Sequence, residues 1–429
     1  MKILIVSQYF YPENFRINDL VCGLIERGHK VTVLTGQPNY PQGKFVSGYG
    51  WFGPRREQIF KANIMRVPLI ARGNGGAFRL MLNYLSFAFF GCLGVLFQLR
   101  GCFDVIFVFE ISPVTIGFPA ILARKKFRAP ILFWVLDLWP DSLKAVNALQ
   151  SPALLRVLDK MVSWIYARCA RILVSSKAFT SDIVAHGKLV RDVHYFPNWI
   201  EPEYKNPPTP FDKGGDGHRL DLVLNPPLSK GVGGFCFRII YAGNIGEAQG
   251  FSSILEAIKK VARIFPEVRW VVAGNGRMLD WVRQEIDNCG LNNCVTFLGQ
   301  LAPEKMPALL ATADALLLSL KPDPVFDKTV PGKVQSYLAA GRPILAMIDG
   351  EGANIIEESK AGFVGPAGNS HALVQNIRNL IELSAKEQER LGDNGRQYAR
   401  KHFEREKLFD RLEGWMRDVV QEEQESRCR

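Results

Sequence analysis

The spacing of apolar and polar residues in the first half of the chain predicts strands and helices in alternation. The spacing of Leu20, Leu24 and Ile25 predicts an amphipathic helix over 16–27 that ends at Gly28, and a further helix is predicted over 152–167. Short apolar runs predict buried strands at 3–6, 30–34, 64–67, 105–109, 131–136, 172–174 and 193–196. Strands that alternate with helices predict a parallel sheet covered by helices on both faces.

The same alternation begins again after an interruption at 205–235, a stretch with five prolines and six glycines that is typical of a linker or an insertion. The later strands are predicted at 239–242, 270–273, 295–298, 315–318 and 344–347. A chain of 429 residues is too long for one ordinary core, and two domains of roughly 200 residues each are expected. We therefore predict an α/β protein of two doubly wound, Rossmann-like domains facing across a cleft. The first covers 1–204 and the second 236–404.

Charge and cysteine content narrow the kind of protein. The net charge is +11, and the first 130 residues carry 16 Lys and Arg against 6 Asp and Glu, so nearly all of it lies there. Such an asymmetry predicts an acidic partner, which is nucleic acid, anionic lipid or a phosphorylated substrate. The eight cysteines form no C-x-x-C pair, which argues against zinc and a disulfide framework and favours a reducing cytosol. The opening apolar run at 3–6 is too short for a signal peptide.

An uncharged stretch of 20 residues, 80–99, lies between Arg79 and Arg100. It is long enough to span a bilayer, but a true span would separate the strands at 64–67 and 105–109, which belong to one sheet. The favoured alternatives are a helix covered by other parts of the protein and a helix in shallow contact with a membrane, and a spanning helix is the least favoured of the three. The side chains expected to contact acceptor and membrane are Trp51, Phe52, Arg55, Arg56, Phe89 and Phe90.

Several catalytic motifs are absent. The turn after the first strand reads SQYFYPEN and lacks G-x-G-x-x-G, and the sequence has no P-loop, H-E-x-x-H or G-x-S-x-G. The second domain instead has glycines directly after two strands, at Gly243 and Gly246 and at Gly274 and Gly276. Glycine lets backbone N–H groups approach a phosphate, although it also simply closes tight turns.

A lysine begins the helix predicted after Pro331 and Gly332. Lys333 in a first helical turn is unfavourable beside the helix dipole, unless it holds an anion there. A phosphate ligand is the first interpretation, and a solvated lysine is the alternative.

These residues resemble a known family. The strand-end glycines, VTFLGQL and the segment P-G-K-V-Q-S-Y-L-A-A-G-R-P are similar to the donor domain of retaining, family 4 glycosyltransferases of GT-B fold. YFYPE, RGHKVTVLTGQPNYPQG, DLWPDS and FPNWIEP resemble the subgroup that builds bacterial surface polysaccharides, including colanic-acid and O-antigen transferases of fucosyl or N-acetylfucosaminyl type. The likeness covers the chain except 205–235. It implies that the last helix, 405–429, packs back on the first domain and buries the stripe that includes Leu408, Leu412, Trp415 and Met416.

The resemblance also implies site residues. Asp137 and Lys333 are the expected catalytic residues. The donor is expected to be bound by Gly243, Asn244, Gly246, Gln249, Gly274, Gly276, Lys328, Lys333, Ser336 and Tyr337. Asn244 and Gln249 stand where many members have Arg and Lys, and Lys328 and Ser336 stand where the family's E-x7-E motif has carboxylates, the second of which usually holds the ribose. Asp137 matches a family histidine and is expected to contact the transferred sugar or the acceptor hydroxyl, with a helix N-cap as the alternative.

The resemblance therefore implies a retaining glycosyltransferase without metal or cofactor, whose donor is a UDP- or GDP-linked sugar. The expected acceptor is a polyprenyl-diphosphate-linked oligosaccharide, and the enzyme is expected to bind the anionic cytoplasmic face of the bacterial inner membrane. Two alternatives are a UDP-sugar 2-epimerase of the same fold and a basic nucleic-acid-binding protein. The second is disfavoured because the sequence shows no RNA-binding motif.

Overall fold

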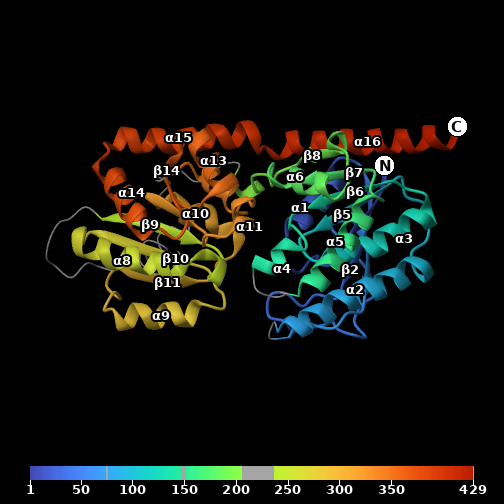
Figure 1. The fold of residues 1–429 in the computed structure, drawn as a ribbon, viewed down its shortest axis with the longest axis horizontal. Coiled ribbons are helices and arrows are strands. Elements are labelled where there is room, and N and C mark those ends of the chain that lie inside the picture. The colour runs from blue at the N-terminus through green and yellow to red at the C-terminus, as the bar shows by residue number, and fades with distance from the viewer. Residues whose placement is uncertain (74–75, 146–150, 205–235, 429) are drawn as a thin grey trace. The chain divides into compact units, whose positions relative to one another are not determined.

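The computed structural model describes residues 1–73, 76–145, 151–204 and 236–428. They form two compact units, Met1–Pro197 with Glu406–Arg429, and Asn198–Arg405 (Figure 1). The two-sheet α/β architecture agrees with the prediction from the sequence. Residues 198–204, which we expected to close the first domain, belong to the second unit, and the predicted linker 205–235 lies outside the described residues.

The first unit contains an eight-stranded sheet in the order β3-β4-β2-β1-β5-β6-β7-β8. Its strands are β1 (Lys2–Val6), β2 (Lys30–Gly36), β3 (Arg56–Ile59), β4 (Ala62–Val67), β5 (Val105–Glu110), β6 (Ile131–Val135), β7 (Arg171–Val174) and β8 (Val193–Tyr195). Neighbouring strands pair in parallel, with Ile5 beside Val33 and Phe107, except that β3 pairs antiparallel with β4. The carboxyl ends of the parallel strands therefore share one edge of the sheet.

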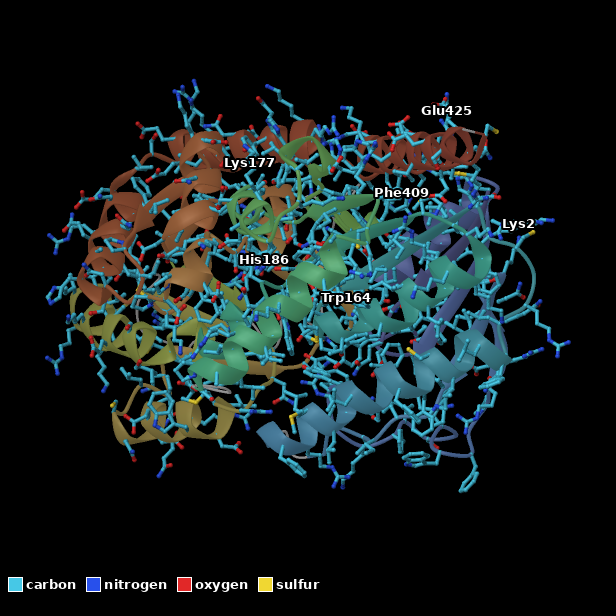
Figure 2. The ribbon with its side chains drawn as sticks, turned by 45° about the vertical axis from the view of Figure 1, so that its right-hand side comes forward. Lys2, Trp164, Lys177, His186, Phe409 and Glu425 are labelled. Atoms are coloured by element: carbon cyan, nitrogen blue, oxygen red, sulfur yellow. The ribbon has the colours of Figure 1, made fainter. Side chains whose placement is uncertain are left out.

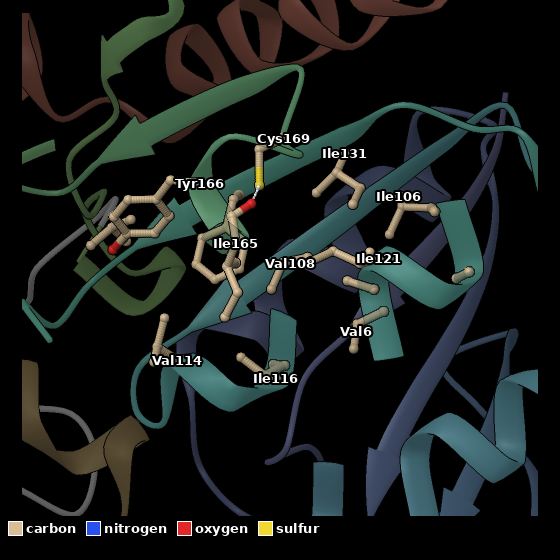
Figure 3. Close-up of a cluster of buried hydrophobic side chains, with 14 of the residues drawn as sticks. Val6, Ile106, Val108, Val114, Ile116, Ile121, Ile131, Ile165, Tyr166 and Cys169 are labelled. Atoms are coloured by element: carbon tan, nitrogen blue, oxygen red, sulfur yellow. Dashed lines mark hydrogen bonds between the residues drawn. The ribbon is translucent and has the colours of Figure 1, made fainter. Parts of the chain in front are cut away.

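Helices connect these strands and cover the sheet. They are α1 (Arg16–Glu26), α2 (Ala77–Phe97), η1 (Val114–Ile116), α3 (Gly117–Phe127), α4 (Asp141–Ala145), α5 (Pro152–Tyr166), α6 (Phe179–Ala185) and η2 (Val190–Asp192). Val6, Ile106 and Val108 of the sheet lie in one buried cluster with Ile121 of α3 and Ile165 of α5 (Figure 3). At roughly 25 cal/mol per Å² of apolar surface removed from water, such contacts are the main source of stability.

The second unit contains a six-stranded parallel sheet in the order β11-β10-β9-β12-β13-β14. Its strands are β9 (Phe237–Ala242), β10 (Val268–Ala273), β11 (Val295–Gly299), β12 (Ala315–Ser319), β13 (Ile344–Met347) and β14 (Gly362–Gly365). Its helices are η3 (Pro202–Tyr204), η4 (Glu247–Gln249), α8 (Phe251–Ile264), α9 (Leu279–Asn288), η5 (Pro303–Lys305), α10 (Met306–Ala311), α11 (Pro324–Asp327), α12 (Val334–Ala340), α13 (Gly350–Ser359), α14 (Ser370–Glu382) and α15 (Ala385–His402). Hydrophobic clusters cover both faces of this sheet.

The last helix, α16 (Arg405–Cys428), has all but its first residue in the first unit. Arg27 pairs with Asp410 at 2.6 Å, and His29 lies 2.7 Å from Glu413. Phe409, which is labelled in Figure 2, is fully buried. The Arg27 guanidinium lies 5.6 Å from the centre of its ring. Of the stripe predicted to be buried, Leu408, Leu412, Met416 and Val419 are each at most 1% exposed, whereas Trp415 is only partly buried.

Candidate active site

A turn of fixed shape follows β9 at the carboxyl edge of the second sheet. Gly243 has a φ of +141°, in the region that favours glycine. The side-chain oxygen of Gln249 accepts hydrogen bonds from the Gly246 N–H at 3.1 Å and from Asn244 Nδ2 at 3.2 Å. The protein's own hydrogen bonds therefore hold this turn, which we call the β9 turn (residues 243–246). The binding of a phosphate at this turn stays a prediction.

The glycines after β10 have a packing explanation. A Cβ at Gly274 would lie 1.8 Å from the Gly243 carbonyl oxygen, and one at Gly276 would lie 2.2 Å from the Ile245 oxygen. These glycines are required because the β10 loop packs directly on the β9 turn. Their direct contact with a nucleotide stays a prediction, because the sequence cannot distinguish a glycine that admits a ligand from one that admits a neighbouring loop.

Lys333 lies beside the β9 turn, at the N-cap position of α12. Its Nζ is enclosed and has no hydrogen-bond partner among the described residues. It lies 3.8 Å from the centre of the Tyr241 ring and 3.0 Å from where a Cβ on Gly243 would be. Burial lowers the pKa of this ammonium group to about 7. An enclosed cation that lacks an acceptor but borders a glycine turn is suited to an anionic ligand.

The other residues predicted on this segment differ in their contacts. Tyr337 is buried, and its hydroxyl bonds to the backbone of Ala242 at 2.8 Å, so it supports the β9 turn from beneath. Lys328 follows the short helix α11. Ser336 donates a hydrogen bond from Oγ to Glu201 Oε2 over 2.5 Å, and Glu201 was not among the residues predicted from sequence.

Asp137 lies in the loop that follows β6, at the carboxyl edge of the first sheet. Burial raises the pKa of its carboxyl to about 6, and interactions with Ser142, Trp139 and Ser112 oppose the rise. The alternative of a helix N-cap is wrong, because α4 begins four residues later, at Asp141. A carboxyl group with this pKa changes its charge just below neutral pH, which suits proton transfer or contact with a hydroxyl group.

A second carboxyl group lies behind Asp137 and was not predicted. Glu110 ends β5, is fully buried, and has no hydrogen-bond partner for either carboxyl oxygen among the described residues. Burial, and then the charge of Asp137, raises its pKa well above the ordinary value. In the sequence, Glu110 can be recognised as the polar residue that ends the apolar run VIFVFE. Its proximity to Asp137 follows only from the pairing of β5 with β6. Across the described ranges, no group of three or more His, Cys, Asp or Glu could hold a metal ion, and catalysis without metal stays a prediction.

Aromatic side chains and one arginine gather at the same edge of the first sheet. Tyr9 stacks on Phe15 with ring centres 4.9 Å apart, and Tyr40, 38% exposed, lies 5.1 Å from Phe15. The Arg72 guanidinium lies 5.1 Å from the centre of the Tyr40 ring and donates to the Tyr9 hydroxyl at 2.9 Å. Glu13 joins the loops by accepting from the backbone N–H groups of residues 39 and 40. In this platform Tyr9 is buried, whereas the Tyr40 ring is exposed enough to stack on a sugar and Arg72 can attract a phosphate.

Helix α2 contains most of the uncharged stretch and is covered on one side only. Asn83, Phe87 and Val95 are fully buried. The uncovered side chains are Phe78 (69% exposed), Met81 (45%), Leu85 (50%), Phe89 (61%), Leu96 (46%) and Phe97 (71%). We call this set the α2 face. Helix 78–97 is long and apolar enough to span a bilayer, but the strands before and after it, β4 and β5, lie in one sheet, so a span is excluded in this fold.

The residues predicted to contact a membrane divide between the surface and the interior. Phe52 is fully exposed and Trp51 is 42% exposed. Phe90 does not belong to the α2 face, because it is partly buried against the core and its ring lies 5.6 Å from Trp51. Arg56 donates to the Gln98 carbonyl at 3.2 Å, beyond the end of α2, and Arg55 bonds to the Trp51 carbonyl.

Each of the two units matches a known protein family. Residues 14–199 match the family described as "Glycosyl transferase 4-like domain", and residues 237–398 match "Glycosyl transferases group 1". Over 396 residues the chain is 25% identical to WcaI of Escherichia coli K12, provisionally named a colanic acid biosynthesis glycosyl transferase, with 89% of this chain and 93% of WcaI covered. It is 27% identical over 258 residues to WbjE of Pseudomonas aeruginosa, a provisionally named glycosyltransferase, covering 58% of this chain and 60% of WbjE.

Solved structures share the fold. HepE of Anabaena, crystallised with UDP and glucose, superposes with a TM-score of 0.68 over 97% of this chain and 99% of HepE, at 15% identity. WaaG, a glycosyltransferase of lipopolysaccharide biosynthesis, superposes with a TM-score of 0.64 over 93% of this chain and 95% of WaaG, at 13% identity. At these identities, the comparison speaks for the fold alone.

Proposed function

We propose that this chain, whose two units match glycosyltransferase families and which has the GT-B fold, transfers a sugar, with retention, in the synthesis of a bacterial surface polysaccharide. The donor is a UDP- or GDP-linked sugar of the L-fucose or N-acetyl-L-fucosamine type. The acceptor is an oligosaccharide on polyprenyl diphosphate. The assignment of WcaI to colanic acid biosynthesis and the UDP bound to HepE support this proposal. The alternative 2-epimerase is not favoured, because both family models describe transferases.

The observation that carries the proposal is the enclosed Lys333 ammonium beside the β9 turn. When the bond between the sugar and the donor diphosphate breaks, negative charge grows on the diphosphate. A cation held in a site of low dielectric stabilises that charge more strongly than water does. The N–H groups of Gly243, Ile245 and Gly246 donate to acceptors within the protein, so the β9 turn shapes this site and the lysine supplies the charge. Lys333 therefore binds the leaving diphosphate beside the β9 turn.

At the edge of the first sheet, Asp137 has the chemistry to position a hydroxyl group. An ionised carboxylate accepts a hydrogen bond from a hydroxyl and orients it, either on the transferred sugar or on the acceptor. The platform of Tyr9, Tyr40 and Arg72 lies at the carboxyl end of the same sheet. The exposed part of the Tyr40 ring and the Arg72 guanidinium match the sugar and the diphosphate of the proposed acceptor.

A nucleotide panel tests the donor site. A ligand that binds only the folded protein stabilises it by about 2.7 kcal/mol at a concentration one hundred times its Kd. For a domain of about 200 residues this corresponds to a rise in melting temperature of roughly 5 °C or more. We expect UDP or GDP, and its sugar conjugate, to give such a rise. If no nucleotide in the panel changes the melting temperature, the proposed function is wrong.

We propose further that the first unit binds the cytoplasmic surface of the inner membrane through the α2 face. Its side chains are apolar and exposed, and Figure 1 shows α2 on the outside of the first unit. A basic residue adjoins the end of the helix, where Lys126 Nζ donates to the carbonyls of residues 95, 96 and 99. An apolar helix face next to basic residues is suited to an interface of anionic lipids.

Changing Leu85 and Phe89 together to Glu should abolish binding to anionic liposomes. Each substitution removes an apolar side chain whose burial contributes about 1.5–3 kcal/mol. We therefore expect the affinity for liposomes in sedimentation assays to fall at least tenfold. Wild-type binding should weaken with salt. Both residues are exposed, so the variant should keep the wild-type melting temperature.

The matched control is Ile264→Glu, which changes an exposed apolar residue (47%) of the second unit and should bind liposomes as the wild type does. Phe90 is unsuitable for this test, since its packing on Trp51 would link binding to stability. Undiminished binding by the folded Leu85 and Phe89 variant would show that the α2 face does not contact the membrane.

A further inference from the structure

A basic pocket lies in the first unit, between the end of α3 and the end of α16 (Figure 1). Its volume is about 440 Å³, and we call it the α3–α16 pocket. The charged residues that line it all belong to the first unit and are Arg124, Lys125, Arg128, Arg168, Glu423 and Arg427. Five of these six side chains are cationic, so the pocket attracts anions.

The α3–α16 pocket is separate from the donor and acceptor sites proposed above. Residues 124–128 precede β6, whereas Asp137 follows it, so the pocket and Asp137 lie at opposite edges of the first sheet. The five residues of β6 span roughly 16 Å between them. Lys333 belongs to the second unit. The charge of the pocket therefore calls for an explanation of its own.

The helix dipole explains only part of this charge. Basic residues are favourable in the last turn of a helix, and Arg124 and Lys125 occupy that turn of α3. The dipole of α3 does not explain why two other segments bring arginines to the same pocket, Arg168 after α5 and Arg427 in α16. Glu423 pairs with Arg427 at 3.3 Å and neutralises one charge, so a surplus of positive charge remains.

Arg128 has a backbone conformation that arginine rarely adopts. It is the C-cap of α3, with a φ of +54°, and its N–H donates to the Arg124 carbonyl at 2.8 Å. Glycine is the usual residue at such a left-handed position, because it has no Cβ. Within the described ranges, the side chains of Arg128 and Lys125 form no hydrogen bond or ion pair. A strained cation without an internal partner is expected where a ligand supplies the partner.

Two of the arginines are oriented by contacts within the protein. Arg124 Nη1 donates to the Arg168 carbonyl. The Arg168 guanidinium lies 3.9 Å from the centre of the Trp164 ring, which is labelled in Figure 2, and donates to the Trp164 carbonyl at 2.7 Å. Guanidinium groups match phosphate oxygens in pairs. A pocket of this volume falls within the range of small-ligand sites and has room for more than one phosphate.

We propose that the α3–α16 pocket binds an anion with two neighbouring phosphate groups. Lys125 and Arg128 supply free charges, and the oriented Arg124 and Arg168 complete the site. The two phosphates belong either to a soluble diphosphate or to the head group of a lipid. The anion offsets the repulsion among the cations, and it links α3 to the end of α16 through Arg427. This site does not depend on the proposed function, since it includes neither Lys333 nor Asp137.

Calorimetric titration with inorganic pyrophosphate tests the pocket. The background is the Lys333→Met variant of the whole chain, in which the proposed donor site has lost its cation. We expect one saturable site whose affinity falls with salt. Adding Arg128→Gly should lower this affinity at least tenfold, because a hydrogen bond between charged groups is lost. The matched control is Lys61→Gly, which removes an exposed cation of the same unit at a φ of +66° and should keep the affinity.

Sedimentation with vesicles that contain cardiolipin, a lipid with two phosphates, distinguishes the two sources. If the lipid head group is the ligand, Arg128→Gly should weaken vesicle binding more than Lys61→Gly does, and pyrophosphate should compete with the vesicles. If the ligand is a soluble diphosphate, the two glycine variants should bind vesicles equally, and only their affinities for pyrophosphate should differ.

The proposal is overturned if Arg128→Gly and Lys61→Gly agree both in pyrophosphate affinity and in vesicle binding. Both variants should stay folded, because glycine suits a left-handed backbone, and their melting temperatures check this. Should Arg128→Gly unfold, Lys125→Gln decides the question in the same two assays, with Lys44→Gln, another exposed lysine of the first unit, as its control. Equal binding by that second pair then overturns the proposal.

Discussion

Replacing Lys333 by Met should lower kcat/KM by about 100- to 1000-fold, the range found when one preorganised donor is removed from a developing negative charge. The same variant should be more stable than the wild type when no nucleotide is present. Methionine is similar in length and apolar, whereas the wild-type ammonium is enclosed and has no acceptor among the described residues. A residue that costs stability in the free enzyme and stabilises the leaving group during the reaction is expected at a functional site.

The pH dependence of the stability gained in Lys333→Met identifies the cause of that gain. The pKa of Lys333 in the folded protein is about 7, below the ordinary value of 10.5, so between these pH values the unfolded chain binds more protons. The wild type should therefore gain stability as pH rises through this window, relative to the variant. The difference in melting temperature should be largest at pH 7 or below and small near pH 10.

A matched control for the lysine substitution is Lys305→Met, at an exposed position of the second unit. It should leave both kcat/KM and the pH dependence of stability at wild-type values. Wild-type kinetics in Lys333→Met would show that the ammonium does not contact the leaving group, and the proposed donor site would have to be abandoned.

The fold was largely predictable because its strands are short apolar runs. VIFVF in β5 and ALLLS in β12 are buried along their whole length, as central strands of a parallel sheet must be. β3 was not predicted, because REQI is polar and half exposed. It forms a strand only through antiparallel pairing with β4, which is a tertiary property.

The site was predictable where neighbouring residues in sequence form it. The β9 turn and Lys333 follow from glycines after a strand and from a lysine at the start of a helix. Glu110 and Glu201 were missed because their positions depend on strand pairing and on a contact across 135 residues. Phe89 and Phe90 are equivalent in the sequence, and only the packing of α2 shows that one points outward and the other lies against Trp51.

Replacing Asp137 by Asn should lower kcat by about 100-fold or more, within the range of 10² to 10⁴ that positioned acid–base groups contribute. Asparagine keeps the shape and one acceptor oxygen but cannot carry the negative charge. Because Asp137 lies in the first unit, the rise in melting temperature caused by the nucleotide should be unchanged. In the wild type, kcat should fall as pH decreases through about 6, the pKa to which burial raises this carboxyl, since protonation removes the active form.

Glu110→Gln is the control that makes the Asp137 result specific. Glu110 is fully buried and its pKa is raised well above the ordinary value, and glutamine keeps the shape of this side chain without an ionisable group. This variant should keep turnover and melting temperature close to wild type. If Asp137→Asn loses stability but keeps its turnover per folded molecule, Asp137 serves the fold and not the reaction. If both variants lose turnover to the same extent, the functional unit is the carboxyl pair, whose two groups then share the negative charge that the reaction requires.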